Sequence, residues 1–101
     1  MTSGTDTAGN DKIQAVARVL AGIRDPQRMR RFMGEIMTPA EMHDLGLRWR
    51  LLQGLQAGDS QRQIAGELGV SLCKITRGSR ILKQPGSVTA TILRKKRVKK
   101  S

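Results

Sequence analysis

The sequence has few aromatic residues, one cysteine and no long apolar run. Phe32 and Trp49 are its aromatic residues, and tyrosine is absent. Because single-stranded nucleic acid is bound by stacking its bases on aromatic rings, this scarcity argues against such a strand as the main ligand. A lone cysteine excludes an intramolecular disulfide and is typical of a reducing compartment. With no signal-peptide pattern and no run of membrane-spanning length, we expect a cytoplasmic protein that does not enter a membrane.

The sequence also lacks the groups of reactive side chains that enzymes and metal sites require. His43 and Cys73 are each isolated from other candidate ligands or nucleophiles. No glycine-rich phosphate-binding loop is present, and the pattern brings no acid-base pair together. We therefore expect no catalytic activity, no metal ion and no resident cofactor.

Acidic residues are scarce relative to basic ones. The 101 residues include 19 Lys+Arg and 8 Asp+Glu, which gives a formal net charge of +11. Such an excess is the electrostatic footprint of a protein that binds a polyanion. Hydrophobic residues make up 38% of the chain, so we expect one small domain with a thin core that a second copy of the chain would complete.

Two short helices joined by a tight turn are predicted within residues 60–83. Ser60 and Gln63 have the spacing of a capping box, which starts the first helix. Gly69 can take the left-handed conformation that ends it, and Ser71 can cap the second helix. This order of signals predicts a helix-turn-helix.

The second of these helices presents an outward face without carboxylates. Leu72 and Ile75 are predicted to face inward, which leaves a small, polar or basic set made up of Cys73, Lys74, Thr76 and Arg77. Such a face suits the major groove of DNA, where side-chain donors meet base edges and phosphates. A helical corner without a DNA role is the alternative interpretation.

The rest of the chain is predicted to be helical between two polar ends. Residues 1–10 form a disordered leader, and residues 11–84 form an all-α domain whose helices precede and include the helix-turn-helix. Thr38, Pro39 and Glu41 predict a capped start for a long central helix that runs to Ala57. Gly46 within that helix predicts a close helix crossing.

A basic tail is predicted for residues 85–101. Pro85 and Gly86 break the preceding helix, and the tail includes Lys95, Lys96 and Arg97 in a block without acidic residues. We interpret it as a mobile arm that adds salt-sensitive affinity for phosphates. A peripheral membrane anchor is a weak rival, because the tail has few apolar residues.

Several short motifs connect this chain to a known family. They are Thr38-Pro39-x-Glu41, Leu45-Gly46-x-Arg48, Ser60-Gln61-Arg62, Glu67-Leu68-Gly69 and the run Ile75-Thr76-Arg77-Gly78-Ser79. Through them the stretch from Ile13 to Lys83 resembles the bacterial tryptophan repressor family. The resemblance implies an interlocked all-α homodimer that binds a palindromic operator in double-stranded DNA and represses transcription. It also implies L-tryptophan or an analogue as corepressor.

The resemblance further implies a ligand pocket. Arg48 and Arg77 match the arginines that enclose the ligand ring, Arg77 and Thr38 match the groups that meet its carboxylate, and Gly78 also matches. A guanidinium group can both stack on an indole and hold a carboxylate through paired hydrogen bonds. Ile81 departs from the family, which has a serine there that helps hold the ligand's amino group. Recognition of an amine-free aromatic acid, or of no ligand, is therefore an alternative to recognition of tryptophan.

The same resemblance implies the DNA contacts. These residues are Gln61, Arg62, Ser71, Leu72, Cys73, Lys74, Thr76 and Arg77, with Lys95, Lys96 and Arg97 added from the charge of the tail. Arg62 is the first choice for reading a base, because arginine to guanine is the commonest specific contact. A second departure is the tail itself, since the family ends in an amphipathic helix that this segment is predicted to lack.

Two other functions remain open at this point. One is a helix-turn-helix protein that binds DNA without an effector. The other is a non-specific nucleic-acid-binding protein driven by the tail, which would not distinguish an operator from random DNA.

Overall fold

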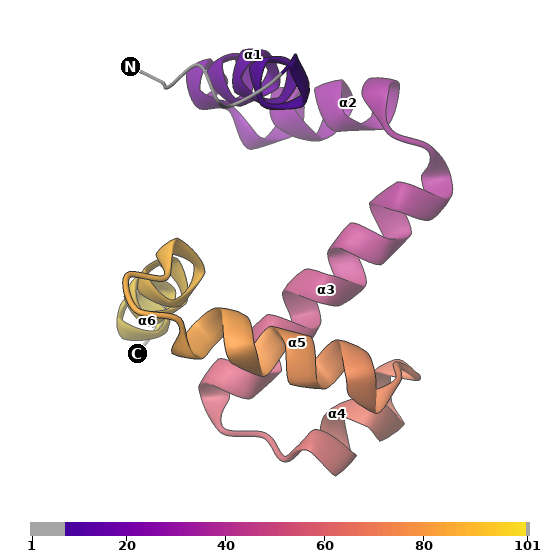
Figure 1. Cartoon of the computed structure of the whole chain (residues 1–101), viewed down its shortest axis with the longest axis vertical. Coiled ribbons are helices and arrows are strands. Elements are labelled where there is room, and N and C mark those ends of the chain that lie inside the picture. Colours follow the sequence, from indigo (N-terminus) through magenta and orange to yellow (C-terminus); the bar gives the residue numbers. More distant parts are fainter. Residues whose placement is uncertain (1–7, 101) are drawn as a thin grey trace. The chain divides into compact units, whose positions relative to one another are not determined.

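The computed structural model describes the backbone of residues 8–100 and the side chains of residues 12–95. Its elements are α1 (Ala8–Gly22), α2 (Pro26–Ile36), α3 (Pro39–Ala57), α4 (Gln61–Leu68), α5 (Leu72–Lys83) and α6 (Val88–Lys100) (Figure 1). The described backbone contains no strand, so the all-α prediction is confirmed. The chain divides into two compact units, Met1–Met42 and His43–Ser101, and α3 begins in the first and continues in the second.

The first unit contains α1, α2 and the start of α3. Helix α2 begins after Asp25, whose carboxylate accepts a hydrogen bond from the Arg28 N–H at 3.1 Å, and Pro26 occupies the first turn. Apolar side chains of α1 remain exposed, including Ile13 at 68%, and α2 has no buried residue. A single chain therefore leaves apolar surface of this unit uncovered.

Helix α1 begins inside the predicted leader. Ala8 to Asn10 are helical, whereas the leader was predicted to extend to residue 10. The rest of the leader, residues 1–7, lies outside the described residues.

The core of the second unit is built where α4 and α6 meet the pair α3 and α5. Its buried side chains are Leu51 and Leu52 of α3, Ile64 of α4, Ile75 of α5, and Ala90 and Leu93 of α6. Ile75 is fully enclosed, with 0% exposure. Trp49, Leu55 and Leu82 pack against this cluster as partly buried residues. The core therefore holds α5 in place along its inner face.

Helices α4 and α5 form the predicted helix-turn-helix. The Ser60 hydroxyl accepts a hydrogen bond from the Gln63 N–H at 3.1 Å, and the Gln63 amide oxygen accepts one from the Ser60 N–H at 3.1 Å. Gly69 has a φ of 65°, the left-handed conformation that a glycine adopts at a helix end. The Ser71 hydroxyl then accepts a hydrogen bond from the Lys74 N–H at 3.3 Å. Local capping thus defines both helices.

Close packing of α3 occurs at Gly54 and against Gly78, and none occurs at Gly46 within the described chain, so the crossing expected there stays a prediction. A Cβ atom added at Gly46 would meet no atom within 4 Å, whereas one at Gly54 would lie 3.3 Å from Ile64 Cδ1. At Gly78 of α5, an added Cβ would lie 2.5 Å from Leu51 Cδ2. Gly78 therefore lets α5 approach α3 more closely than any larger residue would allow.

We expect Gly78→Ala to be about 1–3 kcal/mol less stable than Gly66→Ala. Both substitutions raise helix propensity, but only the first forces a methyl group into Leu51, because a Cβ at Gly66 would meet no atom within 4 Å. Urea unfolding of the two proteins at one protein concentration measures the difference. Equal midpoints would show that α3 and α5 do not pack as closely as described.

The C-terminal segment forms helix α6, where little of a helix was predicted, and the expectation of a mobile arm that binds phosphates stays a prediction. The Ser87 hydroxyl caps α6 by accepting a hydrogen bond from the Ala90 N–H at 3.0 Å. Ala90 and Leu93, three residues apart, are 3% and 4% exposed. The many basic residues of the segment suggested a solvated tail. Two small or apolar positions on one face are nevertheless enough to pack the helix against the core. The side chains of Lys96 and Arg97 lie outside the described residues.

Candidate functional site

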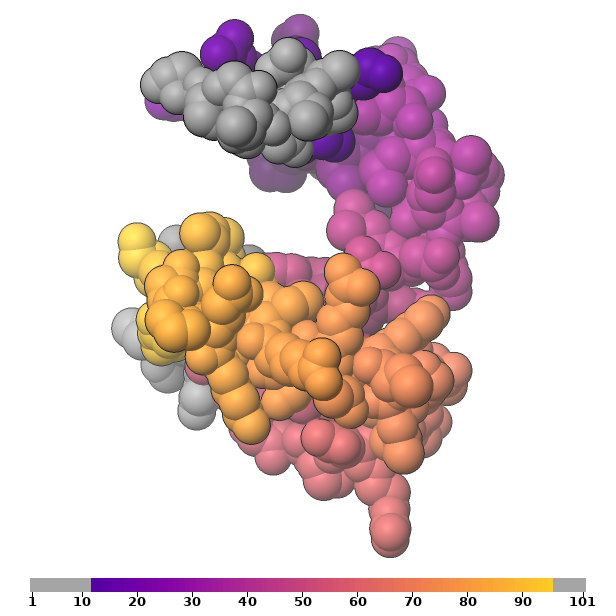
Figure 2. Space-filling model, in the orientation of Figure 1, coloured from indigo at the N-terminus to yellow at the C-terminus, as the bar shows by residue number. Residues whose placement is uncertain are grey.

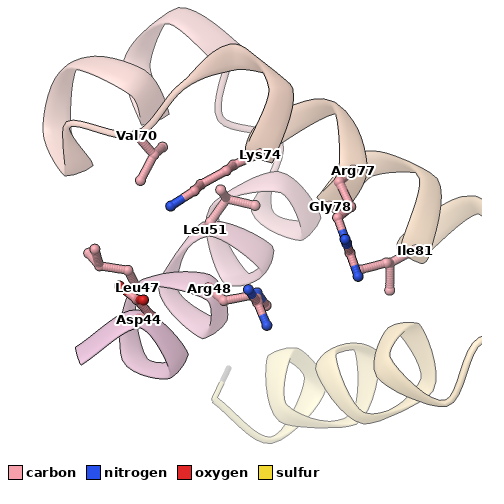
Figure 3. Close-up of a pocket in the computed structure, with 9 residues that line it drawn as sticks. All are labelled: Asp44, Leu47, Arg48, Leu51, Val70, Lys74, Arg77, Gly78 and Ile81. Atoms are coloured by element: carbon pink, nitrogen blue, oxygen red, sulfur yellow. The ribbon is translucent and has the colours of Figure 1, made fainter. Parts of the chain in front are cut away.

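A pocket lies between α3 and α5 in the second unit. Its volume is about 170 Å³, and its lining residues are Asp44, Leu47, Arg48 and Leu51 of α3, Val70 of the turn, and Lys74, Arg77, Gly78 and Ile81 of α5 (Figure 3). On each helix the lining positions follow the spacing i, i+3, i+4 and i+7. That spacing describes one face of an α-helix, so two helical faces form the opposite walls of the pocket.

The charged groups of the pocket lie at two ends. Figure 3 shows the guanidinium groups of Arg48 and Arg77 on the side where Ile81 lies. The ammonium group of Lys74 and the carboxylate of Asp44 lie on the side of Leu47. The apolar side chain of Leu51 lies between these ends (Figure 3). The arrangement suits a small ligand with an apolar body and an anionic group.

The structure brings together four of the residues that were predicted to bind a ligand. Arg48, Arg77, Gly78 and Ile81 all line the pocket. Thr38 belongs to the first unit, where its hydroxyl accepts a hydrogen bond from the Glu41 N–H at 3.1 Å and caps α3. Ligand binding by all five residues stays a prediction.

Sequence reasoning missed part of this lining. Asp44, Leu47, Leu51 and Val70 were not among the predicted ligand residues, and Lys74 was assigned to DNA alone. The helical spacing of Asp44 with Arg48 and of Lys74 with Arg77 is present in the sequence. It identifies a site only when the two helices are known to face each other.

The residues predicted to contact DNA lie on an exposed part of α4 and α5. Gln61, Arg62, Ser71, Leu72, Cys73, Lys74, Thr76 and Arg77 are all exposed, and long side chains of α4 project from the second unit (Figure 2). Leu72 is 59% exposed, so the prediction that it faces inward is wrong. It occupies the first position of α5, before the buried face begins at Ile75.

One ion pair joins this part of the molecule to α3. Arg50 Nη2 lies 3.9 Å from Glu67 Oε1, and both side chains are about half exposed. Exposed pairs of this kind contribute roughly 0–1 kcal/mol, so the position of α4 depends mainly on Ile64 in the core. On α6, Lys95 is exposed as well.

Two kinds of feature are absent from the described residues. None of their helices combines the length and the apolar character that crossing a bilayer requires. Within the same residues, no group of three or more His, Cys, Asp or Glu side chains is placed to hold a metal ion.

Comparison with known proteins identifies relatives of this chain. The family described as Trp repressor protein matches residues 11–97. A Trp operon repressor homolog of Vibrio parahaemolyticus is 38% identical over 71 residues, which cover 69% of each chain. Proteins with the same name from Xylella fastidiosa and Chlamydia caviae are 36% and 37% identical over 67 and 62 residues. These matches cover 65% and 60% of this chain, and 73% and 61% of the respective relatives.

Proposed function

The chain belongs to the Trp repressor family, a family of transcription regulators rather than enzymes, and we propose that this DNA-binding repressor is controlled by L-tryptophan or a related aromatic ligand. The observation that carries the proposal is that α5 both lines the pocket and presents the exposed residues predicted to contact DNA. Arg77 and Ile81 of this helix line the pocket, while Cys73 and Thr76 are exposed beside α4. A ligand in the pocket would therefore touch the same helix that reads DNA.

The proposed active form is a homodimer on a palindromic operator. Exposed apolar residues support this form, including Ile13 at 68% and Val19 at 48% on α1. A stripe of this kind needs a partner, and a second copy of the chain supplies one with matching symmetry. The two helix-turn-helix units of such a dimer, related by a two-fold axis, would bind two half-sites of the operator. These half-sites would lie about one turn of the DNA helix, roughly 34–36 Å, apart.

The proposed ligand acts on the orientation of the helix-turn-helix formed by α4 and α5, called the reader below. Arg48 is on α3 and Arg77 is on α5, so a molecule held by both would fix the angle between these helices. A ligand that binds one angle better than another shifts the population toward it by its difference in affinity. Operator binding would then respond to the ligand without any ligand contact to DNA.

Phosphate contacts in this proposal come from cations around the reader. Lys74 is exposed on α5, and Lys95 is exposed on α6. Such contacts position the protein and make its affinity fall with salt, whereas base contacts give specificity. Binding to the chromosome would place the protein in the cytoplasm, associated with the nucleoid.

The proposal is tested by selecting a binding site from random duplex DNA and measuring affinity for it at fixed salt. We expect Arg62→Ala to lose about 1–3 kcal/mol of preference for the selected site over random duplex, because a bidentate contact to guanine is lost. Arg24→Ala removes the same charge from an exposed position between α1 and α2. It should leave the preference intact and reduce only the general affinity.

Two results would contradict this account. If no selected site emerges and random duplex binds equally well, the net charge of +11 would favour the non-specific binder. If Arg62→Ala and Arg24→Ala lose preference equally, Arg62 does not read a base.

A further inference from the structure

Helix α5 and the segment after it carry positive charge without any acidic residue. No Asp or Glu follows Glu67 in the sequence, whereas ten Lys and Arg residues do. Arg80 and Lys83 belong to this group and lie in the last turn of α5, where both are exposed. Within the part of the chain whose side chains are described, neither forms an ion pair. Neither lines the pocket between α3 and α5, so both remain available to an anion outside the chain.

These two cations share a face of α5 with residues predicted to enter the groove of DNA. Cys73, Thr76, Arg80 and Lys83 follow one another at intervals of three, four and three residues, and all four are exposed. Such spacing keeps side chains on one side of an α-helix. The other side is buried in the core at Ile75. A duplex that meets Cys73 and Thr76 therefore also faces Arg80 and Lys83.

The distance along α5 determines which part of that duplex the two cations reach. At a rise of about 1.5 Å per residue, Arg80 and Lys83 lie roughly 6 and 10 Å beyond Thr76 along the helix axis. The major groove of B-DNA is about 8.5 Å deep and about 12 Å wide. When Cys73 and Thr76 are at the base edges, side chains displaced this far along the helix are at the rim of the groove. The rim consists of the phosphates of the two strands, so it offers anions to both cations.

We propose that Arg80 and Lys83 bind backbone phosphates at the rim of the groove that the N-terminal half of α5 enters. The inference rests on the proposed function, because it requires that half of α5 to be in the groove. It extends the DNA-binding surface to the last turn of the helix. The partner is the phosphodiester backbone of the same duplex, which either cation binds without regard to sequence. These contacts fix the position of α5 across the groove and leave base selection to residues nearer its start.

A purely structural role for the two cations makes a different prediction. Cations in the last turn of a helix interact favourably with the negative end of its dipole. Removing them would then lower stability without changing how DNA binding depends on salt. Contacts to phosphates release counterions, so their loss makes the slope of log affinity against log salt concentration shallower. The salt slope therefore distinguishes the two roles.

The test compares an Arg80→Gln/Lys83→Gln double variant with the wild type on the selected site and on random duplex of equal length. Glutamine keeps a long side chain and a good helix propensity but has no charge. We expect the slope to become shallower by about 0.9 for each phosphate contact removed. Affinity for both duplexes should fall by similar factors, so the preference for the selected site is retained.

Two control proteins make this result specific to charge at these positions. Arg18→Gln/Arg30→Gln removes the same charge from exposed positions of α1 and α2, and it should change the slope much less. Arg80→Lys/Lys83→Arg keeps both cations and should retain the slope of the wild type. A change of equal size in the Arg18→Gln/Arg30→Gln protein would reduce the effect to net charge and overturn the inference.

Uncharged phosphate analogues identify the phosphates involved. Single phosphates of the selected site are replaced by methylphosphonates, and the affinity of each duplex is measured. The wild type should lose affinity at phosphates on the rim of the groove. The Arg80→Gln/Lys83→Gln protein should be insensitive at those same positions, because the contacts are already absent.

Two further results would overturn the inference. An unchanged salt slope with a lower urea midpoint would leave Arg80 and Lys83 with a structural role alone. Equal sensitivity of both proteins to every methylphosphonate would show that the two side chains do not contact this duplex. The proposed repressor is judged separately, because it fails if no site is selected, whereas the salt slope can still be measured on random duplex.

Discussion

An Ile75→Ala protein is expected to lose about 2–5 kcal/mol of its free energy of unfolding. Ile75 is fully enclosed, with 0% exposure, and it lies on α5 at the centre of the cluster formed with Leu51 and Ile64. Removing three carbon atoms there leaves a cavity that rigid neighbouring helices cannot close. Urea unfolding followed by circular dichroism measures the loss. Protein concentration must be fixed, because the stability of the proposed dimer would depend on it.

Two companion variants make this result specific to packing. Ile75→Val removes a single carbon atom and should cost about 0.5–1.5 kcal/mol. Thr76→Ala changes the next residue, which is exposed, and should stay within about 0.5 kcal/mol of the wild type. If Ile75→Ala resembled Thr76→Ala, the inner face of α5 would not be buried as described.

The loss has a consequence for function. Helix α5 carries both the pocket residue Arg77 and the exposed Thr76, which is predicted to enter the groove of DNA. A cavity under α5 would loosen the angle at which both are presented. We therefore expect affinity for the operator to depend on the core as much as on the exposed residues. A helix-turn-helix that the core already holds in place loses less conformational freedom when it binds DNA.

The helix-turn-helix could be predicted from the sequence because its signals are local. Ser60, Gln63, Gly69 and Ser71 act on backbone groups within four residues of themselves. Capping energies of this kind do not depend on the rest of the fold. The boundaries of α4 and α5 were therefore readable without tertiary information.

Helix α6 could not be predicted in the same way. Its burial consists of Ala90 and Leu93 against a surface formed by distant residues. The basic residues of the segment are evident in the sequence, but the surface on which α6 packs forms only when the other helices have folded. The prediction that Leu72 faces inward was wrong for a related reason. A single apolar residue at the start of a helix does not show which side of the fold its side chain will face.

The candidate site was predictable only in part. Arg48 and Arg77 were identified from the resemblance, and the structure places both on one pocket. Asp44 and Lys74 carried no signal of their own, because a charged residue on a helix is usually solvated. Gly78 matched the family as a ligand residue, yet its contact with Leu51 gives it a packing role as well. Pairing of helical faces is tertiary information that a single sequence lacks.

Arg77→Ala is expected to weaken ligand binding and the response of operator binding together. Loss of hydrogen bonds to a charged group costs about 1.5–3 kcal/mol, so affinity for the tighter of L-tryptophan and indole-3-propionate should fall roughly 10- to 150-fold. Operator affinity should fall as well and should lose its dependence on that compound, because a ligand changes DNA binding only through its coupling to the same helix. Calorimetry and operator titration with and without the compound measure both effects.

Arg80→Ala and Arg77→Lys separate this coupling from simple charge. Arg80 lies in the last turn of α5 and is exposed, so its loss lowers net charge equally but should leave the ligand response unchanged. Arg77→Lys keeps the charge and removes the planar fork that pairs with a carboxylate, so it should resemble the alanine variant in ligand affinity. It should nevertheless retain more affinity for DNA, because a phosphate accepts either cation. A normal ligand response in Arg77→Ala would remove Arg77 from the pocket assignment and leave α5 as a reader without an effector.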